Sequence, residues 1–192
     1  VTDTGLTLAP MIYEFGWDWS DWNKMAAGTV AGHIIECGGQ ASGGNFLGDW
    51  ESVPDLARIG FPIVEAYPDG TFFITKHDNT GGLVSTETVS EQLLYEIGDP
   101  KEYITPDCVA DFTSIHLEAA GKDRVRVYDI KGRPATEFYK VSMSYDDGFS
   151  AFSTLTYSAP DALKKAEAAD RILRTRLDDL GLIFDEIRTE FL

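Results

Sequence analysis

Residues 61–76 read FPIVEAYPDGTFFITK, and this stretch decides the fold class. Two runs rich in apolar and β-branched residues, 61–67 and 71–76, flank the triplet Pro68-Asp69-Gly70. Proline presets the backbone for a turn and glycine tolerates positive φ, so the triplet is typical of tight turns. The stretch therefore predicts a β-hairpin.

Helical patterns lie on both sides of the predicted hairpin. Each begins at a side chain that can cap a helix and ends near a glycine, which are the usual boundary signals. The second helix also carries small residues that allow close packing against another element, namely Ala26, Ala27, Gly28, Ala31 and Gly32. We expect helices over 6–15, 21–37, 86–97 and 159–180, after caps at Asp3 or Thr4, Ser20 or Asp21, Ser85 or Thr86, and Ser158.

Further strands are predicted in the second half, where apolar and polar residues alternate. They are expected over 113–119, 124–130, 138–145, 149–157 and 182–191, with a second hairpin turn at 146–148. The strand-rich middle favours an α/β fold, or alternatively α+β, in which helices flank a mixed β-sheet. We treat residues 1–192 as a single segment. The dinucleotide-binding glycine fingerprint, the Walker loop and the nucleophile elbow are absent from the sequence.

Composition narrows the function classes. Hydrophobic residues make up 43% of the 192 residues, which is ordinary for a globular protein. The 32 acidic residues against 16 Lys and Arg give a formal net charge of -16. Such a charge repels nucleic acid and anionic membrane surfaces, although a local pocket could still hold a small anion. No apolar stretch approaches the roughly 20 residues of a membrane span, and no signal peptide is visible.

The chain has two cysteines, Cys37 and Cys108, without metal-type spacing. We expect both to be reduced and the protein to be cytoplasmic. The sequence opens on Val1 without a methionine and is at once motif-like. This start predicts an excised part of a larger α/β protein, with further chain ahead of it.

The first candidate site lies at the end of the second predicted helix. His33, Glu36 and Cys37 stand at i, i+3 and i+4, so their side chains share one face. An imidazole, a carboxylate and a thiol suit acid–base or nucleophilic chemistry. The alternative is a satisfied core histidine beside a buried, inert cysteine. The glycine-rich residues that follow are candidate ligand-binding positions: Gly38, Gly39, Ser42, Gly43 and Gly44.

The second candidate site is the loop 76–82, which leaves a strand and precedes a helix. Glycines let backbone amides turn inward and a helix N-terminus adds partial positive charge, so the loop could cradle an anion. The alternative is a plain connecting loop. Tyr103 could line a pocket beside the helix that precedes it, the one predicted over 86–97. The candidate ligand-binding residues of the loop are Lys76, His77, Thr80, Gly81 and Gly82.

Several stretches together resemble the acyclic terpene utilisation family, AtuA. They are VTDTGLTLAPMIYEFGW, AAGTVAGHIIECGGQASGG, VPDLARIGFPIVE, ITKHDNTGGLVSTETVSEQLLYEIGDPKEYITPDCVADF, GKDRVRV and KGRP. The resemblance marks Asp3, the segment 33–44 and the loop 76–82 as family-motif positions, and on this ground Asp3 joins the catalytic candidates. One departure is His77-Asp78-Asn79, where the family pattern has a glycine before Thr80. Family members are longer, with an α/β portion ahead of the Val-Thr-Asp motif.

The resemblance implies a role in bacterial catabolism of acyclic terpenoids, whose acids are processed as CoA thioesters. The first hypothesis is an enzyme acting on a branched acyl-CoA or its acid, with no cofactor assigned. The second is a non-catalytic subunit that binds or organises the enzymes of such a pathway. A third is a metal-dependent hydrolase or lyase that uses His33 and Glu36, although no complete metal site is recognisable. The expected ligand is a small molecule, and homo-oligomerisation is left open.

Overall fold

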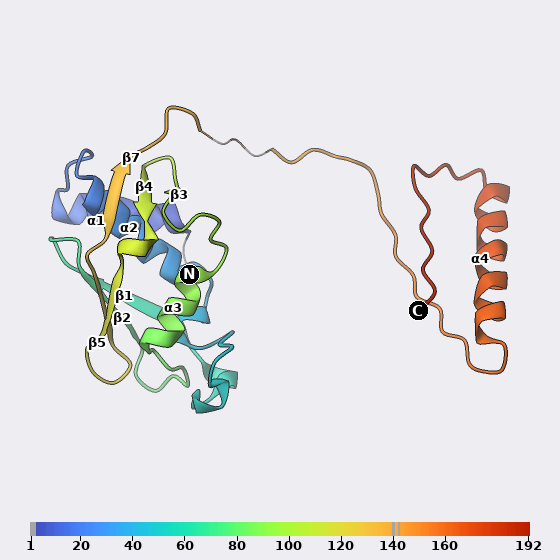
Figure 1. Ribbon diagram of the computed structural model, residues 1–192, viewed down its shortest axis with the longest axis horizontal. Coiled ribbons are helices and arrows are strands. Elements are labelled where there is room, and N and C mark those ends of the chain that lie inside the picture. Colours follow the sequence, from blue (N-terminus) through green and yellow to red (C-terminus); the bar gives the residue numbers. More distant parts are fainter. Residues whose placement is uncertain (1–2, 140, 142) are drawn as a thin grey trace. The chain divides into compact units, whose positions relative to one another are not determined.

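The computed structural model describes residues 3–139, 141 and 143–192 (Figure 1). The chain divides into two compact units, Val1–Val141 and Ser142–Leu192. Among the described residues, the first unit contains helices and two antiparallel β-sheets, and the second contains one helix. The predicted class of helices combined with sheet is therefore confirmed, in the α+β form.

Three helices of the first unit begin where the sequence predicts caps. They are α1 (Thr4–Phe15), α2 (Trp22–Ile35) and α3 (Thr86–Leu94). Asp3 accepts a hydrogen bond from the Gly5 amide, and Asp21 accepts one from the Lys24 amide. Ser85 forms a reciprocal capping box with Thr88. These side chains satisfy amides that have no partner within a helix, which fixes each starting point.

The larger sheet has the order β1-β2-β6-β5, and every pair in it is antiparallel. The predicted hairpin is confirmed, with Ala66 opposite Phe72 and Gly70 at φ 89° in the turn. The smaller sheet has the order β3-β4-β7 and is also antiparallel. The strands are β1 (Pro62–Ala66), β2 (Phe72–Lys76), β3 (Tyr103–Ile104), β4 (Cys108–Asp111), β5 (His116–Ala119), β6 (Val125–Tyr128) and β7 (Lys131–Pro134).

Helix α2 forms the centre of the core, and its residues 25–34 are all buried. Its small residues let other backbones approach closely. A Cβ on Gly32 would lie 2.3 Å from the carbonyl oxygen of Thr4, and a Cβ on Gly28 would lie 2.5 Å from Leu8 Cδ1. The inward side chains of the larger sheet join the same core, namely Phe72, Ile74, Val125 and Val127. The packing of α1 on α2 fixes where the ends of these two helices meet.

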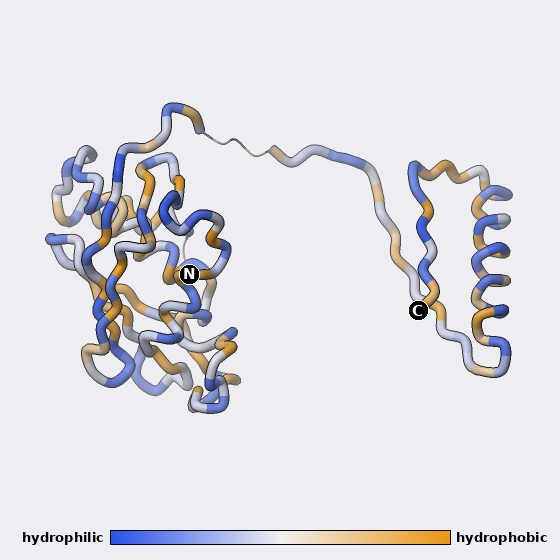
Figure 2. The backbone as a smooth tube through the Cα atoms, in the orientation of Figure 1, coloured by the Kyte–Doolittle hydropathy of each residue, from blue (hydrophilic) through white to orange (hydrophobic). Residues whose placement is uncertain are grey.

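The second unit has the helix α4 (Ala162–Asp179), which the 3.6-residue period predicts. Figure 2 shows α4 as a mainly hydrophilic helix with interspersed hydrophobic residues. The strands predicted at 138–145, 149–157 and 182–191 are wrong for the described residues, which form no strand there. Positions 140 and 142 lie outside the described residues. A two-stranded hairpin needs a third strand or a packed apolar face to be stable. None of the described residues of this unit is buried, so they form no packed face on which a hairpin could rest.

Candidate functional site

The buried imidazole of His33 meets the carboxylate of Glu36 at the end of α2. The His33 side chain is 1% exposed and its Nδ1 lies 2.9 Å from Glu36 Oε1, whereas Glu36 is 21% exposed. On the other side of the ring, Nε2 lies 3.0 Å from the backbone oxygen of Gln92 in α3. The i, i+3 spacing seen in the sequence therefore does bring the two side chains together, and it places Glu36 between the core and solvent.

Two hydroxyl groups complete a ring of polar contacts around this pair. The hydroxyl of Thr4, in the first turn of α1, donates to Glu36 Oε2. The hydroxyl of Tyr103, on β3, lies 3.3 Å from His33 Nδ1. The rings of Tyr103 and Phe112 contact the imidazole edge to face, with centroids 5.2 and 5.3 Å away. Residues from α1, α3 and β3 thus converge on the His33–Glu36 pair at the end of α2.

Gln92 holds the imidazole from the α3 side. Its side-chain nitrogen donates to the backbone oxygen of His33 at 2.7 Å. Together with the contact of His33 Nε2 to the Gln92 backbone oxygen, this joins α2 and α3 by two side-chain-to-backbone hydrogen bonds. The side chain is fully buried, and its Oε1 has no hydrogen-bond partner. An unpaired buried oxygen costs about 1–3 kcal/mol of stability. The α3 side of the site therefore carries a hydrogen-bond acceptor without a donor.

Burial governs the electrostatics of the site. Desolvation lowers the pKa of His33, against the opposing influence of Glu36, the Gln92 carbonyl and Glu96. Burial also raises the pKa of the Tyr103 hydroxyl, and nearby Glu36 raises it further. The site therefore disfavours an isolated positive charge on the histidine and a negative charge on the tyrosine.

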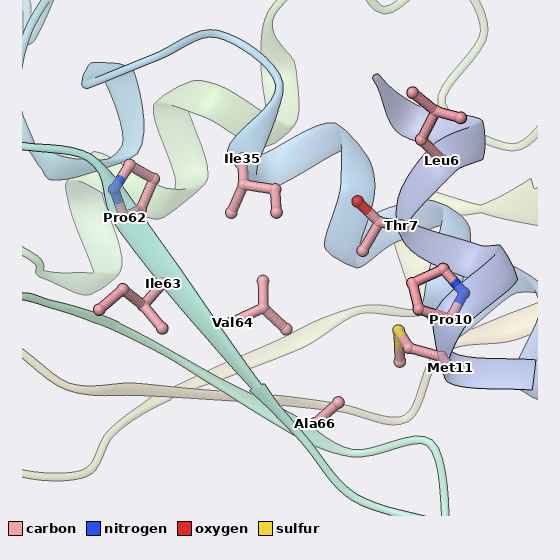
Figure 3. Close-up of a pocket in the computed structure, with 9 residues that line it drawn as sticks. All are labelled: Leu6, Thr7, Pro10, Met11, Ile35, Pro62, Ile63, Val64 and Ala66. Atoms are coloured by element: carbon pink, nitrogen blue, oxygen red, sulfur yellow. The ribbon is translucent and has the colours of Figure 1, made fainter. Parts of the chain in front are cut away.

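An apolar groove of about 490 Å³ lies between α1 and β1. Figure 3 shows Ile35 between the side chains of the strand and those of the helix. Ile35, which lines the groove, is the last residue of α2 and directly precedes Glu36 in the chain. The sequence does not reveal this groove, because its two walls are about fifty residues apart. The lining residues are Leu6, Thr7, Pro10, Met11, Ile35, Pro62, Ile63, Val64 and Ala66.

The other catalytic candidates have simpler surroundings. Asp3 is exposed and caps α1, one residue before Thr4. Cys37 follows Glu36, is half-buried and is a free thiol. Cys108 is also free but fully buried, and its burial raises its pKa. Within the described part of the chain, no group of three or more His, Cys, Asp or Glu side chains is arranged to hold a metal ion.

The two glycine-rich loops predicted as ligand sites lie against each other and against the segment between them. The buried hydroxyl of Ser42 donates to the backbone oxygens of Gly39 and Gly60, at 3.0 and 2.9 Å. The Gly44 amide donates to Gly39, and the Leu83 amide donates to Ser42. These amides are thus bonded to carbonyl groups of the protein itself. Gly38 and Gly43 adopt positive φ, of 60° and 96°.

The loop 76–82 is held in the same way. A Cβ on Gly81 would lie 2.2 Å from the carbonyl oxygen of Asp55, and a Cβ on Gly82 would lie 2.6 Å from that of Ile59. The Gly81 amide donates to Arg58 at 2.7 Å. Close backbone packing thus accounts for both glycines, and ligand binding at this loop stays a prediction.

Lys76 anchors this loop from β2. Its Nζ donates to the backbone oxygen of Thr80 at 3.0 Å and lies 3.7 Å from Asp123 Oδ2. His77 is exposed to solvent. Asn79 adopts φ 64°, a left-handed backbone conformation that asparagine tolerates.

The comparisons with known proteins agree with the resemblance in the sequence. No curated protein and no solved structure matches the chain significantly. No helix among the described residues combines the length and apolarity needed to cross a membrane. The family model described as acyclic terpene utilisation family protein AtuA matches residues 1–192. Because this match spans the whole sequence, the chain belongs to the acyclic terpene utilisation family, AtuA.

Proposed function

We propose that this protein binds the branched acyl chain of an acyclic terpenoid acid, presented as a CoA thioester, in the groove between α1 and β1. The observation that carries the proposal is the apolar lining of the groove, which includes Ile35, the residue before Glu36. Its volume of about 490 Å³ lies within the range of small-molecule sites. Family membership supports the choice of an acyclic terpenoid.

The chemistry of the lining favours the acyl chain over the CoA moiety. The nine lining residues are apolar apart from Thr7, so phosphates would lose their hydration in the groove without gaining partners. Each 100 Å² or so of apolar ligand surface removed from water contributes roughly 2.5 kcal/mol. The acyl chain is therefore expected to supply most of the affinity, with CoA remaining outside the groove.

Geranyl-CoA or citronellyl-CoA is expected to raise the melting temperature of the protein, whereas CoA alone is not. A ligand at one hundred times its Kd adds about 2.7 kcal/mol of stability, which corresponds to roughly 5–10 °C for a chain of this size. Differential scanning fluorimetry measures the shift. Equal shifts with CoA and acyl-CoA would contradict recognition of the acyl chain.

A matched pair of variants locates the site. Leu6→Trp fills the groove from an exposed position, since Leu6 lines the groove and is 66% exposed. Leu94→Trp makes the same change on α3, where Leu94 is 72% exposed and outside the groove. We expect Leu6→Trp to weaken acyl-CoA binding at least about tenfold and Leu94→Trp to leave it unchanged. Unaltered binding in both variants would move the site away from α1.

A second candidate function, a subunit that organises pathway enzymes, is favoured by the second unit. Its described residues include many large apolar side chains that are exposed, which is unusual for a protein surface. Phe149 is 106% exposed and Phe152 is 92% exposed. Such side chains are typical anchors of protein–protein interfaces.

The double variant Phe149→Ser/Phe152→Ser tests this second function. We expect it to weaken binding to a purified dehydrogenase or carboxylase of the pathway at least about tenfold, because interface aromatic residues often contribute 2 kcal/mol or more. Acyl-CoA binding by the first unit is expected to stay unchanged. Surface plasmon resonance measures the partner. Undiminished binding by the variant, or no binding by the parent protein, would contradict a role for this surface.

A further inference from the structure

The hydrogen bonds of His33 require a proton between its ring and Glu36. Nε2 faces the backbone oxygen of Gln92, which only accepts, so Nε2 must carry a hydrogen. Nδ1 faces Glu36 Oε1 at 2.9 Å. Without a proton on one of these two atoms, lone pairs would face each other at hydrogen-bond distance. One proton therefore lies between Nδ1 and Oε1, whichever atom holds it.

The surroundings favour keeping that proton. Glu36 and Glu96 both act on the His33 ring, from the end of α2 and from just after α3. Asp3, at the start of α1, acts with the same two carboxylates on Tyr103 of β3, whose hydroxyl contacts Nδ1. Loss of the shared proton would add a negative charge among these acidic groups. At the same time burial opposes a separate charge on the imidazole.

We propose that His33 and Glu36 form a proton-transfer site, in which Glu36 is the general acid–base and His33 holds and positions the proton that they share. This inference rests on the proposed function, because it takes the reacting ligand to be the thioester bound in the groove between α1 and β1. We take Glu36 to be the group that contacts the ligand, because it is 21% exposed and is hydrogen-bonded to Thr4, which lies one helical turn before Thr7 of the groove lining. His33 acts only through Glu36, because it is 1% exposed.

The proposed reaction is reversible proton transfer at the carbon next to the thioester carbonyl. A C–H bond breaks, its proton goes to Glu36 Oε2, and the electron pair moves into the carbonyl to form an enolate. The proton between Oε1 and Nδ1 then rests on His33, and the negative enolate offsets the imidazolium charge that burial would otherwise oppose. The hydroxyl of Thr4 donates to Oε2 before the transfer and can accept from it afterwards, because hydroxyls do both. The reverse step returns a proton to carbon and needs no other reactant.

Heteronuclear NMR of the ligand-free chain tests the shared proton directly. At neutral pH we expect a strongly deshielded, slowly exchanging proton in the hydrogen bond between His33 Nδ1 and Glu36 Oε1, with His77 and His116 giving solvent-exposed reference signals. In Glu36→Gln this signal should disappear, because the glutamine amide can itself donate to Nδ1. Glu14→Gln, an exposed change on α1, should leave it intact. An unprotonated Nδ1 facing an ionised Glu36 carboxylate would overturn the proposal.

Isotope exchange tests the catalytic role separately. A branched acyl-CoA incubated with the full chain in heavy water should gain deuterium next to the carbonyl, as read by mass spectrometry. Glu36→Gln should slow this exchange by about 10²–10⁴-fold while keeping its affinity for acyl-CoA. Binding without exchange overturns the inference and leaves the proposed function standing. Absence of binding defeats the proposed function, and the NMR result then decides whether the pair holds its proton.

Discussion

Gly32→Ala is expected to cost at least about 3 kcal/mol of unfolding free energy, a large effect for adding one methyl group. The new Cβ would lie 2.3 Å from the Thr4 carbonyl oxygen and 2.8 Å from the Thr4 carbonyl carbon and Cα. All three contacts are with backbone, so rotation of a side chain cannot relieve them. The helices α1 and α2 must separate, and the hydrogen bond from Thr4 to Glu36 is then expected to weaken as well.

Gly5→Ala is the matched control, because it adds the same methyl group to a helix of the same pair. A Cβ on Gly5 would meet no atom within 4 Å. Gly5 is the second residue of α1, and alanine is favoured over glycine within helices by at most about 1 kcal/mol, so this variant should be unchanged or slightly more stable. Urea unfolding of both variants gives the comparison. Similar stabilities for the two would show that α1 does not approach α2 at Gly32.

The sequence predicts most of the helices because their boundaries depend on local chemistry. Asp3, Asp21 and Ser85 each cap a helix as expected, since a capping side chain acts within three residues of itself. The hairpin at 61–76 follows from its turn triplet for the same reason. The predicted end of the helix capped by Ser85 is less accurate. Apolar spacing extended the predicted helix to residue 97, whereas α3 ends at Leu94.

The smaller sheet could not be predicted, because its strands are short and depend on distant partners. Tyr103–Ile104 is two residues long and lies among prolines and aspartates that indicate turns. Lys131–Pro134 ends on a proline and is a strand only because it pairs with β4 and packs on α2. The sheet matters for the site, since it carries Tyr103 to His33.

The candidate site is likewise only partly predictable from the sequence. Helical spacing places His33 beside Glu36 from sequence alone, but Thr4 and Gln92 reach the pair only through tertiary packing. Glycine-rich segments show the opposite difficulty. In a sequence, a glycine that makes room for a ligand cannot be told apart from a glycine that makes room for another backbone segment. At Gly81 the structure shows the backbone of Asp55 in close approach.

Phe72→Ala is expected to destabilise the protein by about 3–5 kcal/mol, because truncating a buried phenylalanine removes apolar contacts and leaves a cavity. Phe72 is fully buried on β2, pairs with Val127 of β6, and packs in the core that includes α2. The variant should therefore also disturb the groove between α1 and β1, since β1 is held in the sheet by its pairing with β2. Acyl-CoA binding should weaken together with stability.

Phe149→Ala makes the same truncation where the side chain is 106% exposed, and it should change stability by less than about 0.5 kcal/mol. Guanidinium unfolding followed by tryptophan fluorescence reports on the first unit, where all four tryptophans lie. A large loss of stability in Phe149→Ala would mean that the second unit contributes to the core of the first. A small loss in Phe72→Ala would contradict the assignment of the larger sheet to that core. The contrast between two chemically identical changes thus isolates burial as the cause.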